Sequence, residues 1–325
     1  MAFEAIYLFK IVVLGFQAMI PLALCAMGEV LAEKAGVVNI GLEGILLTSA
    51  FTGVVGAWSM GNVMPDTMMW FAPVFGLLVG ALTGLLIGAI HGYISIYLKG
   101  DQIISGVAIN LFALGFVAFG IIVVWGVHGA FSMSPDLKLP GWNILLAPAV
   151  EGNDPVFVGK ISYLLPFTFL MAGFIWWIIN KTAFGLRVKA VGENPEAADV
   201  AGIRVERVRM VSVLIGAALG GLAGAYLSVD WNGLITRDIA AGRGFIALAT
   251  VVFSKLNPLL TLLGAFVFGL FDNLGLWLST DPYANQLGLN YFIRMLPYVV
   301  TLVVVVGVIG RARFPKASGQ PYRRE

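Results

Sequence analysis

Long apolar runs recur along the whole chain and are separated by short segments rich in Gly, Pro and charged residues. A run of roughly 20 apolar residues has the length at which an α-helix crosses about 30 Å of hydrocarbon. The pattern therefore predicts an all-α fold, a polytopic transmembrane helix bundle with about nine spans. The predicted spans are 9–31, 37–59, 70–98, 103–126, 162–180, 208–229, 243–256, 259–279 and 291–310.

The orientation of the bundle depends on the segment 243–256, which is short for a straight span and either crosses or is re-entrant. If it crosses, most of the 20 Lys and Arg residues fall on one side. The positive-inside rule then places the N-terminus outside and the C-terminus in the cytoplasm. A re-entrant segment would put the basic tail at 311–325 outside, so we favour crossing. The charged loop at 181–207 is then cytoplasmic.

Composition supports a membrane as the solvent, because 59% of the 325 residues are hydrophobic and only 12% are charged. We expect a single transmembrane domain over 1–325, in contact with lipid. The net charge of +2 says little by itself, because in a membrane protein the location of charge matters more than its sum. We expect no nucleic-acid partner. The single cysteine, Cys25, excludes an intrachain disulfide. No charged leader with a small-residue cleavage site precedes the first span, so we expect an uncleaved chain.

The sequence contains no motif for catalysis. It lacks the G-x-x-x-x-G-K-[ST] loop that binds ATP phosphates, and it has neither a metal-ligand cluster nor a Ser/His/Asp arrangement. We therefore expect no enzyme, no metal and no cofactor, and any ATP hydrolysis must come from another polypeptide.

Two glycine stripes indicate close helix packing. Small residues at every fourth position form a smooth groove in which another backbone approaches closely. The stripes favour packing inside a compact bundle, with a subunit interface as the alternative. Their members are Gly76, Gly80, Gly84, Gly88 and Gly92 in one run, and Gly216, Gly220 and Gly224 in the other.

The cytoplasmic loop contains a short helix with clear start and stop signals. Asn194 is a good N-cap, Pro195 suits the first helical position and Gly202 is a natural terminator, which predicts a helix of about seven residues. Its small residues Ala197, Ala198 and Ala201 form a face that fits a groove on a partner. An ordinary loop helix is the alternative.

Ionisable residues within spans are costly and are functional candidates by default. The set here is short: Glu43, His91, Arg243, Asp272 and Arg294. His91 and Asp272 are equally consistent with helix packing. The set lacks the series of acids that a proton-coupled pump needs, which argues against a secondary transporter.

Three segments in order resemble one family. They read GEVLAEKAGVVNIGLEG at 28–44, AVGENPEAADVAGI at 190–203 and GRGFIALA at 242–249, followed by Asn257-Pro258. These segments resemble the permease subunits of ABC importers for simple sugars, nucleosides and branched-chain amino acids, and the match is nearest to the nucleoside permeases. The resemblance extends over nearly the whole chain.

The resemblance implies a bacterial inner-membrane importer with three kinds of partner: a second permease, a cytoplasmic ATPase, and an extracytoplasmic binding protein or lipoprotein. The second permease is expected to be a paralogue, although a homodimer stays open. The helix in 190–203 would couple the chain to the ATPase. The coupling residues are Gly192, Glu193, Asn194, Glu196, Ala197, Ala198, Asp199 and Gly202.

A neutral, hydrogen-bonding substrate is expected to contact polar and aromatic groups in or near the spans. Our candidates are Asn39, Glu43, Asn110, Arg243, Asn273 and Trp277. Permeases for ribose-like sugars or branched-chain amino acids are the nearest alternatives. A secondary transporter, with uptake independent of ATP, is the alternative from a different class.

The same segments suggest an inverted repeat. Glu43-Gly44 and Arg243-Gly244 occupy matching positions, and each block is followed by a Pro-led helix with spaced glycines. Inverted repeats are known in transporters that gate around a site at the membrane midplane. Because the matching charges are opposite, we expect Glu43 and Arg243 to form an ion pair where the two halves meet, with chance similarity as the alternative.

Overall fold

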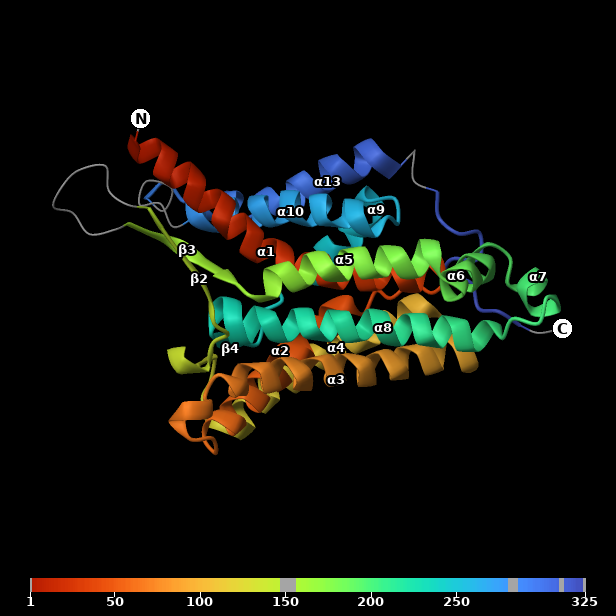
Figure 1. The fold of residues 1–325 in the computed structure, drawn as a ribbon, viewed down its shortest axis with the longest axis horizontal. Helices are drawn as coiled ribbons and strands as arrows, with labels where there is room; N and C mark the ends of the chain where they lie inside the picture. The colour runs from red at the N-terminus through yellow and green to blue at the C-terminus, as the bar shows by residue number, and fades with distance from the viewer. Residues whose placement is uncertain (1, 147–155, 280–285, 310–312, 324–325) are drawn as a thin grey trace.

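The computed structural model describes residues 2–146, 156–279, 286–309 and 313–323. The chain is a bundle of long helices lying roughly side by side (Figure 1). Within the described residues, 7 helices are long and apolar enough to cross a membrane. They are α1 (Ala2–Lys34), α2 (Leu42–Gly61), α3 (Phe71–Gly92), α4 (Gln102–Trp125), α5 (Leu164–Lys181), α8 (Val205–Tyr226) and α10 (Pro258–Ser279).

This architecture confirms the predicted all-α transmembrane bundle, but the count of spans stays a prediction. The two remaining apolar helices are short: α9 (Arg243–Phe253) has 11 residues and α13 (Leu296–Ile309) has 14. A straight span needs about 20 residues. With 11 residues, α9 is too short to cross a bilayer as a straight helix.

The two ends of the bundle carry different structures (Figure 1). At the end where α1 begins, β2 (Gly141–Leu146) pairs antiparallel with β3 (Val156–Ser162). Two shorter strands, β1 (Ala130–Ser132) and β4 (Leu234–Thr236), also pair antiparallel. The opposite end carries α6 (Ala183–Glu193), α7 (Pro195–Val200) and the C-terminal segment, and α12 (Asn290–Ile293) precedes α13.

Helix α8 lies at the centre of the bundle, and both glycine stripes pack within this chain. A Cβ atom at Gly28 of α1 would lie 2.8 Å from Gly216 Cα, and one at Gly84 of α3 would lie 2.6 Å from Gly221 Cα. These distances leave no room for a side chain, so backbones meet directly. The alternative of a subunit interface for the stripes is therefore wrong.

The core is formed by α1, α2 and α8, whereas α4 and α5 lie at its edge. In the most apolar stretch of each helix, 72% of α1 is buried within the chain, against 22% of α4 and 28% of α5. The exposed side chains of α4 are large and apolar, including Ile104, Leu111 and Phe119. This face is suited to lipid or to another membrane subunit.

Candidate functional site

The segment 35–41 between α1 and α2 is irregular backbone enclosed in the helix bundle. Such backbone persists at membrane depth only when its polar groups find partners inside the protein. Here the Val38 N–H donates to Gln102 Oε1 at 2.8 Å, and the Asn39 N–H donates to Glu29 Oε1 at 2.8 Å. The Asn39 side chain accepts from the Gly41 N–H at 3.0 Å. The polar residues of this motif therefore hold the loop in shape.

Asn110 of α4 fixes the start of α2. Its Oδ1 accepts from the Gly44 N–H at 2.7 Å, and its Nδ2 donates to the Ile40 carbonyl at 3.0 Å. Gly44 has no space for a side chain, because a Cβ atom there would lie 2.7 Å from the Ile109 carbonyl oxygen. The amides of Asn39 and Asn110, both candidates for substrate contact, are thus bonded to the chain's own backbone.

Glu43 caps α9 from the first turn of α2. Its Oε1 accepts from the Gly242 N–H and its Oε2 from the Gly244 N–H, both at 2.7 Å. A Cβ atom at Gly244 would lie 2.5 Å from Glu43 Cα, so the two helix starts touch. The free N–H groups at a helix start favour negative charge. The Glu43 carboxylate therefore binds α2 to α9; we refer to this contact as the helix-start junction.

Arg243 pairs with Asp272 of α10, and the predicted ion pair between Glu43 and Arg243 is not formed. Arg243 Nε and Nη2 donate to Asp272 Oδ2 at 3.0 and 2.8 Å. The guanidinium also lies 5.0 Å from the centre of the Trp231 ring. Glu43 instead binds the backbone N–H groups of Gly242 and Gly244, and the Arg243 guanidinium is directed to Asp272.

The other two candidates for substrate contact lie on α10. Asn273 is buried, and its Nδ2 donates to the Leu14 carbonyl at 2.9 Å and to the Gly269 carbonyl at 3.3 Å. It thereby joins α10 to α1. Trp277 is 40% exposed. Arg243 and Glu43 thus meet at the helix-start junction, whereas Asn273 and Trp277 lie further along α10.

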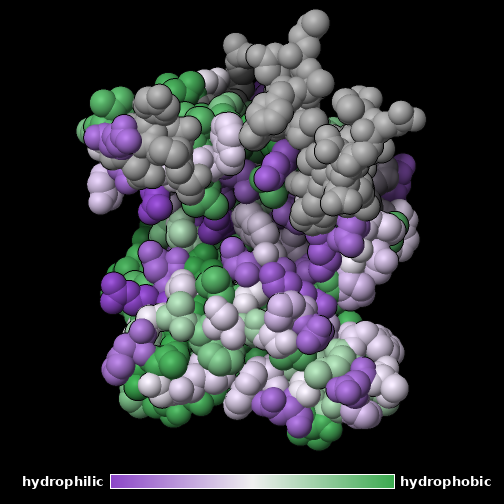
Figure 2. Space-filling model, turned by 90° about the vertical axis from the view of Figure 1, so that its left-hand side faces the viewer, coloured by the Kyte–Doolittle hydropathy of each residue, from purple (hydrophilic) through white to green (hydrophobic). Residues whose placement is uncertain are grey.

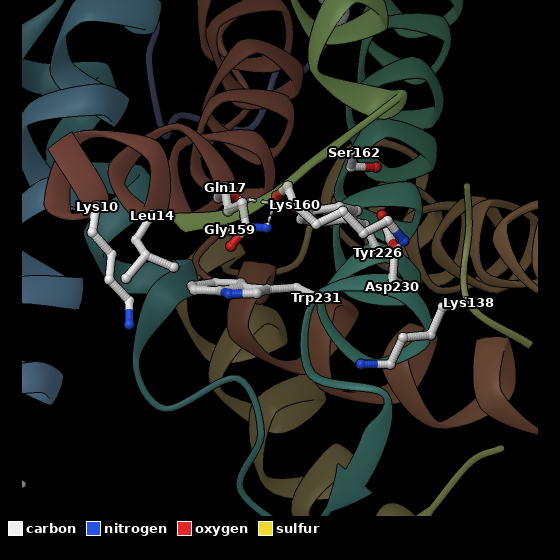
Figure 3. A pocket seen from close by; sticks show the side chains of 10 residues that line it. All are labelled: Lys10, Leu14, Gln17, Lys138, Gly159, Lys160, Ser162, Tyr226, Asp230 and Trp231. Carbon is white, nitrogen blue, oxygen red and sulfur yellow. Dashed lines mark hydrogen bonds and ion pairs between the residues drawn. The ribbon is translucent and has the colours of Figure 1, made fainter. Parts of the chain in front are cut away.

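A cavity of about 280 Å³ lies at the end of the bundle where α1 begins (Figure 3). Lys160 of β3 and Asp230 form an ion pair in its wall, with 3.3 Å between Nζ and Oδ1. The sequence pattern did not identify this cavity, because Lys160 reads as a loop residue and Asp230 follows a predicted span that ends at 229. Its lining residues are Lys10, Leu14, Gln17, Lys138, Gly159, Lys160, Ser162, Tyr226, Asp230 and Trp231.

The short capped helix α7 forms as predicted, but one of its alanines points inward. Asn194 Oδ1 accepts from the Ala197 N–H at 3.0 Å, Pro195 is the first residue of α7, and Gly202 follows with φ +84°. Ala198 is only 4% exposed, because it packs against this chain. Val200 is 91% exposed. The predicted docking face of Ala197, Ala198 and Ala201 is therefore wrong at Ala198, whereas Ala197, Val200 and Ala201 are exposed.

The C-terminal segment braces the corner between α6 and α7. The Ala317 N–H donates to the Gly192 carbonyl at 3.0 Å, and the Tyr322 hydroxyl donates to Asp199 Oδ2 at 3.0 Å. The Gly319 N–H reaches the carbonyl of Gly36 at 3.2 Å. Residues 311–312 and 324–325 of the predicted tail lie outside the described residues. The described part, 313–323, joins the α6–α7 corner to the segment after α1; we refer to these contacts as the tail brace.

A known family matches almost the whole chain. The family described as "Branched-chain amino acid transport system / permease component" matches residues 11–309. The chain belongs to this permease family. It is therefore a multi-pass membrane protein and a translocation component rather than an enzyme, which confirms the resemblance drawn from the three sequence segments.

Several relatives of this permease are similar over nearly its full length. The nucleoside ABC transporter permease protein NupC of Lactococcus lactis is 34% identical over 307 residues, which cover 93% of each chain. The guanosine ABC transporter permease protein NupQ of Bacillus subtilis is 36% identical over 305 residues, which cover 93% of this chain and 92% of NupQ.

Two further relatives bear on partners and substrate. NupB, also a nucleoside ABC transporter permease protein of Lactococcus lactis, is 23% identical over 93% of this chain and 81% of NupB. A relative from Haloferax volcanii, 33% identical over 95% of this chain and 96% of its own length, carries a name that refers to glucose. Relatives of this permease thus include proteins named for two classes of substrate.

Proposed function

We propose that this permease forms the translocation pathway of an ATP-driven importer for nucleosides. The observation that carries the proposal is the 34–36% identity, over more than nine-tenths of the chain, to two permeases named for nucleosides and guanosine. The three motif segments at 28–44, 190–203 and 242–249 support it. A sugar permease is the second candidate, favoured by the relative from Haloferax volcanii.

The partners of the proposed importer are a second permease, a cytoplasmic ATPase and an extracytoplasmic binding protein. NupB and NupC occur in one organism and both resemble this chain, which supports a paralogous second permease. The exposed side of α7, which includes Val200, is the proposed contact with the ATPase. In this arrangement the N-terminus is outside and α7 lies in the cytoplasm.

The proposed pathway is gated at the helix-start junction. Glu43 holds the starts of α2 and α9 together, and Arg243 next to it is tied to α10 through Asp272. Helices that begin inside the membrane are a recurring way to build a transport site. We assign to Asn39 and Asn110 the task of holding this backbone in place, because their amides already bond to it. Asn273 instead joins α10 to α1 through the Leu14 carbonyl.

Reconstituted transport tests the proposal. The permease with its partner subunits in proteoliposomes should take up labelled uridine or guanosine only when ATP is supplied, and excess unlabelled nucleoside should compete while ribose and leucine do not. Uptake of ribose or leucine without competition from nucleosides would overturn the substrate assignment. Uptake of nucleoside that persists without ATP would identify a secondary transporter instead.

A further inference from the structure

The cavity of Figure 3 lies near the start of α1, and Figure 1 shows that α1 begins at the end of the bundle opposite α7. Seen from that end, hydrophilic residues lie across the middle of the face (Figure 2). In the orientation proposed above this is the outer side, where a binding protein would release its cargo. At about 280 Å³ the cavity is near the lower limit for small-molecule sites, so it suits one compact ligand.

Asp230 supplies an acceptor that the protein leaves unused. The residue is 6% exposed and lines the cavity. Its Oδ1 pairs with Lys160 Nζ, and its buried Oδ2 forms no hydrogen bond of normal geometry with a described residue, although the Ser162 hydroxyl lies beside the carboxyl in the same cavity wall. A buried carboxylate oxygen without a donor is costly. A ligand with an N–H group would satisfy it.

The same wall supplies donors and an aromatic surface. The ammonium groups of Lys10, Lys138 and Lys160 line the cavity and can donate only. The Trp231 indole extends across the cavity in Figure 3, with Lys10 and Lys138 on opposite sides of the view. An aromatic face of this kind stacks well on a flat base.

We propose that this cavity binds the base of a nucleoside by its lactam edge; the proposal rests on the nucleoside transport inferred above. A lactam presents a carbonyl oxygen next to an N–H, as in uracil, hypoxanthine and guanine. The carbonyl accepts from a lysine, the N–H donates to Asp230 Oδ2, and the ring stacks on Trp231. Cytosine and adenine carry an amino group where the lactam has its carbonyl, so they match this pattern poorly.

The cavity is one contact away from the helix-start junction. Trp231 lines the cavity and also stacks with Arg243, the first residue of α9, whose neighbouring N–H groups bind Glu43. A base stacked on Trp231 would therefore contact a side chain that also packs against the Arg243 guanidinium. Trp231 thus links a ligand in the cavity to the start of α9.

Cysteine protection tests the proposal directly on the purified importer complex. The native Cys25 is fully buried, so an introduced cysteine reacts alone with a polar maleimide. In a Leu14→Cys variant, uridine or inosine should slow labelling about tenfold more effectively than cytidine or adenosine, the discrimination expected for a paired donor and acceptor. A Val63→Cys variant, 81% exposed and outside the cavity, should show no protection.

Two second substitutions, each added to Leu14→Cys, identify the side chains that recognise the base. Adding Asp230→Asn should abolish the preference for uridine over cytidine. Adding Lys138→Gln should weaken protection by uridine without increasing that by cytidine. In the absence of ligand, each double variant should be labelled at the same rate as Leu14→Cys alone, which shows that the cavity is intact. If one double variant is labelled at a different rate, the result of the other decides.

The outcomes separate this proposal from the function on which it rests. If nucleosides are transported but uridine and cytidine protect Leu14→Cys equally, or neither protects, the lactam site is wrong and the transport function stands. Stronger protection by uridine monophosphate than by uridine would show an anion site and overturn the proposal. If no nucleoside is transported in the reconstituted system, the proposed function itself fails.

Discussion

Replacing Glu43 with Gln should loosen the helix-start junction. The carboxylate accepts one hydrogen bond on each oxygen, from Gly242 and Gly244, both at 2.7 Å. A Gln side chain has one oxygen and one NH₂ group, so one of the two backbone N–H groups would face another donor. The junction would keep one hydrogen bond, which would no longer be assisted by charge.

The magnitude follows from the bonds that are lost. A hydrogen bond to a charged group contributes about 1.5–3 kcal/mol and a neutral one about 1 kcal/mol. The attraction between the carboxylate and the start of α9 adds up to about 1 kcal/mol. Removing a half-buried charge offsets part of this loss, because the neutral side chain is cheaper to desolvate. We expect a net destabilisation of about 2–4 kcal/mol.

The assay is thermal unfolding of the purified permease together with ATP-driven uptake. Glu43→Gln should lower Tm by about 5 °C or more, and uptake should fall with it. The control is Asp66→Asn, which removes an exposed carboxylate and should change neither quantity. An unchanged Tm and unchanged uptake for Glu43→Gln would refute the capping role of this residue.

Two further pairs of variants test the proposed coupling helix α7 and the glycine stripes. Val200→Asp should reduce ATP-driven uptake about tenfold at unchanged Tm, because Val200 is exposed and contributes little to folding. Ala198→Trp should lower Tm, because Ala198 is buried. A lower Tm for Val200→Asp and an unchanged Tm for Ala198→Trp would contradict the assignment of the docking face. Gly84→Leu should prevent accumulation of folded protein in membranes, since a Cβ atom there would meet the backbone of α8. Gly115→Leu, with open space at its Cβ, is the matched control, and equal levels of the two variants would contradict the packing argument.

The spans and the capped helix were readable from the sequence because their causes are local. Runs of apolar residues define membrane helices by length alone. Asn194, Pro195 and Gly202 define α7 through caps that involve only nearby backbone. Glycine spacing likewise indicated where helices approach closely. In each case the interaction lies within one segment or follows from the absence of a side chain.

The partners of individual side chains were not readable in this way. The sequence placed Glu43 near Arg243 but could not show that backbone N–H groups would occupy the carboxylate, or that Asp272 on another helix would bind the guanidinium. Ala198 and Val200 are two positions apart on one short helix, and only the fold shows which of them faces this chain. Such facts depend on contacts between distant segments.

The tail brace has a consequence for the order in which the permease is made. Residues 317–322 bond to Gly192, Asp199 and Gly36, all of which are translated much earlier. During synthesis on the ribosome, the N-terminal parts of a chain fold first. The corner that carries α7 therefore reaches its final geometry only after every membrane helix has been produced. In the proposed importer, a chain that stalls before residue 317 would offer the ATPase an unbraced helix, so assembly would favour permeases whose synthesis has passed that point.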